Sequence, residues 1–236
     1  VRARLAAQGR RPYVIPLGGS NALGTWGYLD AFDELIAQTA KLCSFSADGA
    51  CTNDAGFFSD IVLSTGSGGS LAGIALANRL AGTGAKVWGF GACDSPTWFH
   101  GFINKHVLPH LLPLAGAGVG GEEPLAGLRS EDLAEVRDAK NLGYAQSAPE
   151  ELRTIREVAM RTGVLFDPVY SGKALHCFVG LLRTSPELFG RRVLFWHTGG
   201  LFGLWDKQPQ LQALLEAEPQ GPGPDVVPVF DRTAAL

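Results

Sequence analysis

Short apolar runs recur along the chain and alternate with segments of helical periodicity. A short apolar run is typical of a strand that is buried on both faces of a sheet. Runs that predict such strands lie at 13–16, 60–64, 86–90, 164–166 and 193–196. Strands that alternate with helices predict a parallel sheet covered on both faces, which is an α/β fold.

Apolar residues at helical spacing, together with Ala- and Leu-rich stretches, predict the helices. One helix is expected around 28–36, a second at 71–80, and a third from Pro96 onward. A capping box predicts a fourth, with Ser147 as N-cap and Glu150 three residues later. Its apolar face consists of Leu152, Ile155, Val158 and Ala159. Gly163 is expected to end it.

Three segments lack any periodicity. Those at 43–59 and 115–124 are expected to be surface insertions, and the Pro- and Gly-rich residues 219–236 a loose tail. The chain starts with Val1, has Met160 as its one Met, and opens on residues typical of the end of a helix. We therefore expect it to begin partway through a longer protein.

Composition narrows the class of protein. Hydrophobic residues make up 46% of the 236 residues and charged residues 18%, which excludes a disordered tail or a coiled coil. The 20 basic and 23 acidic residues are mixed along the chain, so no basic face predicts nucleic-acid binding. No apolar stretch approaches the roughly 20 residues that a membrane span needs. Cys43, Cys51, Cys93 and Cys177 form no C-x-x-C pair and are expected to be free thiols.

A glycine-rich loop follows the strand predicted at 60–64. It consists of Thr65, Gly66, Ser67, Gly68, Gly69 and Ser70. Glycines let the backbone approach an anion closely, and the N-terminus of the following helix favours negative charge. The pattern therefore predicts a phosphate cradle, or else a turn that packs a strand tightly against a helix. The pattern alone leaves both interpretations open.

Other polar residues near the predicted strand ends are weaker signals. Thr198 lies in His-Thr-Gly-Gly, where His197 is expected to be a packing or loop histidine. Tyr170 lies in Asp-Pro-Val-Tyr-Ser-Gly-Lys, in which we expect Lys173 to be solvated. His106 and His110 are four residues apart, but Pro109 interrupts the helix face and no third ligand is near, so no metal site is predicted.

Four motifs together resemble a known family. LGGSNALGTWGY, IVLSTGSGGSLAG, LFDPVYSGK and VLFWHTGGLFGLWDK are similar, in order and spacing, to segments of plant-type D-cysteine desulfhydrases. These belong with 1-aminocyclopropane-1-carboxylate (ACC) deaminases among the pyridoxal-phosphate enzymes of the tryptophan-synthase β fold, also called fold type II. The resemblance covers about residues 12–207.

The resemblance implies a site. Pyridoxal phosphate would be held with its phosphate on residues 65–70 and its ring nitrogen facing Thr198, with Tyr170 and Tyr144 as active-site residues. In ACC deaminases a Glu follows the motif's Tyr and partners the ring nitrogen, whereas this chain has Ser171. A neutral hydroxyl makes a weaker electron sink, which favours β-elimination on D-cysteine, giving hydrogen sulfide, ammonia and pyruvate, over ACC ring opening. ACC deaminase and a non-catalytic remnant that binds phosphate or the cofactor remain as alternatives.

The family's Schiff-base lysine lies in an Asn-Lys-x-Arg motif that this chain lacks. We therefore expect residues 1–24 to be a remnant of a small N-terminal domain, residues 25–218 the large cofactor-binding domain, and the chain by itself to be inactive and poorly soluble. A homodimer and an intracellular location, in cytoplasm or mitochondrion, are implied by analogy.

Overall fold

The computed structural model describes residues 1–42, 57–116, 125 and 127–217. The predicted insertions and tail lie almost entirely outside these residues. Among the residues described, no helix combines the length and apolarity that a bilayer crossing requires.

The core is a sheet of four strands in the order β3-β2-β1-β4, and every pair is parallel. The strands are β1 (Asp60–Thr65), β2 (Lys86–Gly91), β3 (Glu135–Asp138) and β4 (Val193–Trp196). The strands predicted at 60–64, 86–90 and 193–196 are confirmed. Strand β3 is not among the predicted strands, because an edge strand reading Glu-Val-Arg-Asp contains a single apolar side chain.

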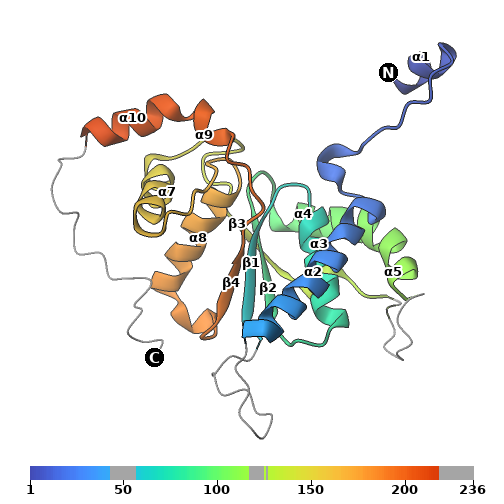
Figure 1. Cartoon of the computed structure of the whole chain (residues 1–236), viewed down its shortest axis with the longest axis horizontal. Coiled ribbons are helices and arrows are strands. Elements are labelled where there is room, and N and C mark those ends of the chain that lie inside the picture. The colour runs from blue at the N-terminus through green and yellow to red at the C-terminus, as the bar shows by residue number, and fades with distance from the viewer. Residues whose placement is uncertain (43–56, 117–124, 126, 218–236) are drawn as a thin grey trace, which may run out of the picture.

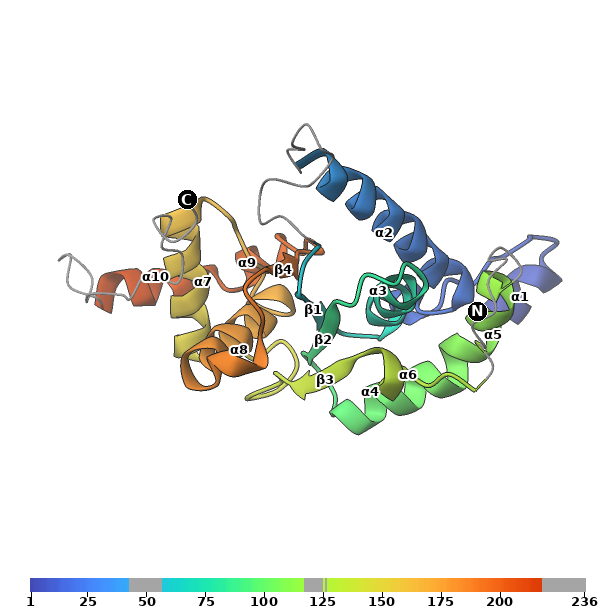
Figure 2. The same cartoon turned by 90° about the horizontal axis from the view of Figure 1, so that it is seen from below.

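Helices cover both faces of this sheet, as the α/β prediction requires (Figures 1 and 2). Alternate residues of β1 point to opposite sides. Ile61 and Leu63 join the core with α3 (Gly69–Leu80) and α2 (Ala22–Leu42), and Val62 joins Phe178 of α8 (Ser171–Thr184). On that second side α7 (Pro149–Thr162) packs on α8.

The remaining elements are short or lie at the margins. They are α1 (Arg2–Ala7), η1 (Leu17–Gly19), α4 (Pro96–Phe102), the π-helical η2 (Ile103–Val107), α5 (Leu108–Gly116), α6 (Ser130–Leu133), η3 (Pro186–Leu188), α9 (Gly203–Asp206) and α10 (Gln208–Ala217).

Two predicted strands are wrong. Residues 13–16 form an extended arm between α1 and η1 that pairs with no strand in the described part of the chain, and Tyr13 and Ile15 are 72% and 76% exposed. Residues 164–166 are irregular, although Phe166 is buried against Phe195. A short apolar run becomes a strand only where a neighbouring strand takes up its backbone hydrogen bonds.

The predicted capping box is displaced by one residue. Pro149 is the first residue of α7, and the amide of Ala148 donates to Glu151 Oε2 at 2.8 Å. Ser147 instead donates its hydroxyl to the carbonyl oxygen of Pro168 at 3.3 Å. Gly163, with φ +74°, ends the helix as predicted.

Candidate functional site

The carboxyl ends of the strands bring three distant segments to one edge of the sheet, the edge nearest α9 in Figure 1. Thr65 ends β1 opposite Gly91 of β2. Leu63 pairs with Trp196 of β4. Thr65 comes two residues after Leu63 and Thr198 two residues after Trp196, so the two threonines lie at corresponding positions beyond this pair. Ligands of parallel α/β sheets bind at this edge.

The glycine loop has the features of an anion cradle. Thr65 is 2% exposed, and its hydroxyl has no hydrogen-bond partner among the described residues. Gly68 is the N-cap of α3 with φ +88°, a conformation that side chains other than glycine rarely adopt. A helix N-terminus and an unpaired buried hydroxyl together can bind a phosphate.

A turn from far upstream completes the loop. Ser20 Oγ accepts a hydrogen bond from the amide of Gly69 at 3.1 Å and donates to Ser67 Oγ at 2.7 Å. A Cβ on Gly18 would lie 2.1 Å from Ser67 Oγ, so glycine is required for this approach. The sequence indicated the motif that contains Ser20 but not its contact with the loop.

Tyr170 lies against the glycine loop from the other side. It is the N-cap residue of α8, and a Cβ on Gly66 would lie 2.6 Å from its ring carbon Cε1. Cys93, beyond β2, donates its thiol to the carbonyl oxygen of Gly66 at 3.0 Å. Burial, followed by the charge of Asp94, raises the pKa of the Cys93 thiol, so it stays protonated at neutral pH.

Asp167 builds the turn that presents Tyr170. Its carboxylate is 1% exposed and accepts from the amides of Val169 at 2.8 Å and Tyr170 at 2.7 Å through Oδ2. Through Oδ1 it accepts from the amide of Ser171 at 2.8 Å and from its hydroxyl at 2.6 Å. Four hydrogen bonds stabilise this buried charge.

The Ser171 hydroxyl is therefore committed to the turn. Besides donating to Asp167, it accepts from the Asp167 amide at 3.1 Å, and the residue is buried. The Ser171 hydroxyl hydrogen is thus used within the protein and is not free for a ligand. Thr198, which is expected to face the ring nitrogen, is exposed.

The two candidate tyrosines come together. The hydroxyl oxygens of Tyr144 and Tyr170 are 2.6 Å apart, and their rings meet edge to face with centroids at 5.7 Å. Burial first, and then the hydrogen bond with Tyr144, raise the pKa of Tyr170 well above its usual value. Tyr170 thus stays protonated at neutral pH.

Lys173 is not solvated, contrary to expectation. It is 1% exposed, and its Nζ lies 3.1 Å from both carboxylate oxygens of Glu151 and 3.0 Å from the carbonyl oxygen of Lys140. Its position near the start of a helix predicts exposure, whereas the packing of α7 on α8 covers it.

His197 shapes the Thr198 loop, in agreement with its expected role. It accepts at Nδ1 from the amide of Gly199 at 3.0 Å and donates from Nε2 to the carbonyl oxygen of Leu165 at 2.7 Å. Gly199 and Gly200 have φ of +92° and +93°, which lets the chain turn directly after Thr198.

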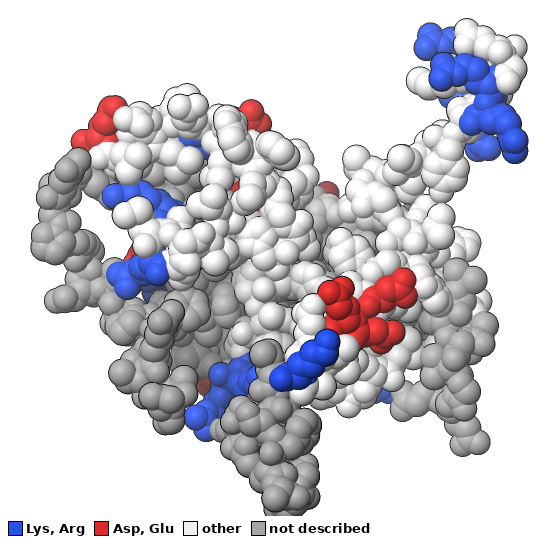
Figure 3. All heavy atoms as spheres, viewed as in Figure 1, with Lys and Arg blue, Asp and Glu red and all other residues white. Residues whose placement is uncertain are grey.

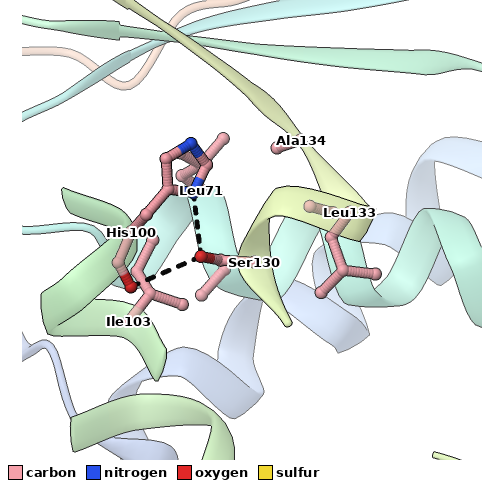
Figure 4. A pocket seen from close by; sticks show the side chains of 8 residues that line it. Leu71, His100, Ile103, Ser130, Leu133 and Ala134 are labelled. Carbon is pink, nitrogen blue, oxygen red and sulfur yellow. Dashed lines mark hydrogen bonds between the residues drawn. The ribbon is translucent and has the colours of Figure 1, made fainter. Parts of the chain in front are cut away.

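A separate hollow contains a His and a Ser but is no active site (Figure 4). Its lining is Leu71, Ala72, Ala75, His100, Ile103, Ser130, Leu133 and Ala134. His100 Nδ1 lies 2.8 Å from Ser130 Oγ, yet the cavity of about 10 Å³ has room for little more than one water molecule.

None of the residues of the glycine loop, 65–70, is charged. On the face in Figure 3 basic groups cluster on the arm that carries α1 and others are scattered over the left and lower parts, while acidic groups cluster over α2. Within the described residues no cluster of His, Cys, Asp and Glu could hold a metal ion. An anion at the glycine loop would therefore be bound by neutral hydroxyls and amides.

Comparisons with known proteins show the family of the chain. Residues 1–199 match the family described as pyridoxal-phosphate dependent enzyme. The mitochondrial bifunctional D-cysteine desulfhydrase/ACC deaminase of Arabidopsis thaliana is 40% identical over 216 residues, which are 91% of this chain and 48% of that protein. D-cysteine desulfhydrase of Yersinia pestis (strain Pestoides F) is 29% identical, over 88% of this chain and 56% of that protein.

A crystal structure of an ACC deaminase homologue shares the fold. It has a TM-score of 0.69 and 29% identity, covering 90% of this chain and 57% of that one. The chain thus spans about half the length of the curated relatives it matches.

Proposed function

The chain belongs to the pyridoxal-phosphate dependent enzymes, because residues 1–199 match the model of that family, and we propose that the site at its strand ends serves β-elimination on D-cysteine. In that reaction D-cysteine and water give hydrogen sulfide, ammonia and pyruvate. The observation that carries the proposal is the pair of hydroxyls of Tyr144 and Tyr170, 2.6 Å apart beside a glycine loop that fits a phosphate. The names of the relatives from Arabidopsis thaliana and Yersinia pestis support the same class of reaction.

The residues of the glycine loop fit the cofactor's phosphate. The buried Thr65 hydroxyl lacks a partner, and the hydroxyls of Ser67 and Ser70 stand at the N-terminus of α3. Residues 65–70 would hold the phosphate, and Thr198 would face the ring nitrogen. When bound, pyridoxal phosphate supplies the electron sink that permits removal of a Cα proton.

The tyrosine pair supplies hydrogen-bond donors. Because the pKa of Tyr170 is raised, its phenol is protonated at neutral pH. It can donate a hydrogen bond to a substrate carboxylate or to the thiolate that leaves from Cβ, but, being protonated, it cannot accept the Cα proton. The base must be another group, and none of the chain's six lysines lies in an Asn-Lys-x-Arg segment.

The partner of the ring nitrogen favours D-cysteine over ACC. With Ser171 committed to Asp167, the available partner is the neutral hydroxyl of Thr198. A neutral partner leaves the cofactor a weaker electron sink, which suffices for expulsion of a thiolate but is less suited to opening a cyclopropane. ACC deamination is the second candidate, because the name of the Arabidopsis thaliana relative covers both reactions.

The test compares both substrates on the full-length gene product. Sulfide release from D-cysteine and ammonia release from ACC are measured, and kcat/KM is expected to be higher for D-cysteine. Thr198→Glu would place a carboxylate at the ring nitrogen and is expected to shift the ratio toward ACC, with Thr198→Gln as the uncharged control. A preference of the unmodified protein for ACC would overturn the proposal. The homodimer and the intracellular location remain predictions.

A further inference from the structure

The loop that carries Tyr144 contains two residues in an uncommon backbone conformation. Residues 139–148 join β3 to α7 without regular structure. Asn141 and Ala145 have φ of +50° and +56°, which is uncommon for residues other than glycine. Such conformations persist only where surrounding contacts impose them.

A buried ion pair supplies those contacts. The side chains of Lys173 and Glu151 are 0% and 2% exposed. Lys173 Nζ donates to the carbonyl oxygen of Lys140 at 3.0 Å, at one end of the loop. Glu151 accepts from Asn141 Nδ2 at 3.2 Å and from the amide of Ala148 at 2.8 Å, at the other end.

The same pair reaches the second tyrosine through its helix. Lys173 lies in the first turn of α8, three residues after Tyr170, the N-cap of that helix. The ion pair therefore connects the start of the helix that presents Tyr170 with both ends of the loop that presents Tyr144. Lys207 adds a contact from outside by donating to the carbonyl oxygen of Ala145 at 2.7 Å.

Stability alone does not account for this arrangement. Two charges lose their hydration on burial, and an apolar pair of similar volume often stabilises a fold as well or better. Apolar side chains could not form hydrogen bonds with the carbonyl of Lys140, the side-chain amide of Asn141 or the backbone N–H of Ala148. The ion pair forms all three hydrogen bonds, and all three groups belong to one loop.

We infer that Lys173 and Glu151 are positioning residues, which hold Tyr144 in hydrogen-bonding contact with Tyr170. The inference rests on the proposed function only in the assumption that the tyrosine pair takes part in the reaction. The contact itself can be tested without substrate or cofactor.

The test is ¹⁹F NMR of the whole chain labelled with 3-fluorotyrosine. The chain has four tyrosines, and Tyr144→Phe and Tyr170→Phe assign their two signals. In Lys173→Met/Glu151→Met, both of these signals are expected to move, and those of Tyr13 and Tyr28 to stay. The double variant leaves no unpaired charge, so it keeps its fold where Lys173→Met alone loses it.

Lys86→Met is the matched control, since Lys86 pairs with Glu135 at 2.9 Å on the surface. It is expected to leave all four signals in place. Wild-type positions of the Tyr144 and Tyr170 signals in the folded double variant would overturn the inference, whatever the outcome of the substrate assays. Failure of both substrate assays with displaced signals would refute the proposed function and leave the positioning role standing.

Discussion

The hydroxyl oxygens of Tyr144 and Tyr170 lie 2.6 Å apart, although the two residues are 26 positions apart in the sequence. Tyr144 is 53% exposed, so the pair has one side open to solvent. A half-buried phenol beside an exposed partner can donate a hydrogen bond to a ligand that enters from the solvent.

Replacing Tyr144 should remove one of the causes that raise the pKa of Tyr170. In Tyr144→Phe the pKa of Tyr170 is expected to fall, while burial still holds it above the usual value of about 10. The absorbance of tyrosinate, followed as pH rises, measures the change. Tyr13→Phe serves as control because Tyr13 is exposed. An unchanged titration of Tyr170 in Tyr144→Phe would contradict the role assigned to the hydrogen bond.

The raised pKa of Tyr170 also predicts how stability depends on pH. A group whose pKa is higher in the folded state contributes stability that is fully present below its unfolded value, near pH 10, and is lost as pH rises toward the folded value. The urea midpoint should thus fall more steeply above pH 10 in the unmodified chain than in Tyr170→Phe. Equal slopes for the two proteins would speak against a raised pKa.

Gly66 is expected to tolerate no side chain. The Cβ of Gly66→Ala would lie 2.6 Å from the Tyr170 ring, and relief of such overpacking costs about 1–3 kcal/mol. Lower stability in urea and weaker binding of pyridoxal phosphate in equilibrium dialysis should follow. Gly101→Ala is the control, because nothing lies within 4 Å of its added Cβ. Normal binding and stability of Gly66→Ala would mean that the ring moves freely.

Two glycines of α8 should respond in opposite ways to alanine. A Cβ on Gly172 would lie 2.5 Å from the carbonyl oxygen of Asp167, a backbone atom, so Gly172→Ala should destabilise by about 1–3 kcal/mol. Gly180 has open space around its Cβ, and Gly180→Ala should stabilise by up to about 1 kcal/mol. Thermal or urea unfolding of the two variants measures the contrast, and equal effects would refute it.

Variants of Ser171 and Thr198 should distinguish a residue needed for stability from a residue needed for cofactor binding. Ser171→Ala leaves the amide of Asp167 without its partner and should cost about 1–3 kcal/mol of stability. Thr198→Val removes an exposed hydroxyl, so it should leave stability within about 0.5 kcal/mol but weaken binding of pyridoxal phosphate. Equilibrium dialysis and urea unfolding of both variants decide the matter. Weakened binding of pyridoxal phosphate by a stable Ser171→Ala variant would mean that residue 171 contacts the cofactor.

Particular residues show how far the pattern of the sequence reaches. The apolar runs at β1 and β2 were recognisable because each of these strands has a paired strand on both sides and is covered by helices, and the run at β4 because four apolar residues follow one another beside β1. Thr65 and Thr198 each lie at or just after the end of a parallel strand, so the rule that such strands end at one edge predicts that they lie together. Tyr170 follows no strand and reaches the glycine loop through the turn that Asp167 stabilises. An equally apolar run at 13–16 became an exposed arm, because nothing in a run itself reveals whether a partner strand lies beside it.

The sequence by itself determined the α/β class, the glycine loop and the tyrosines of the candidate site, since these depend on local periodicity and on motifs. Only the tertiary structure decided that Lys173 is buried against Glu151, that Ser171 serves Asp167 and that Ser20 caps the loop. The physical reason is that burial and hydrogen-bond partners belong to pairs of groups. Glu151 and Lys173 are 22 residues apart and Ser20 and Gly69 are 49 apart, so only packing brings each pair together.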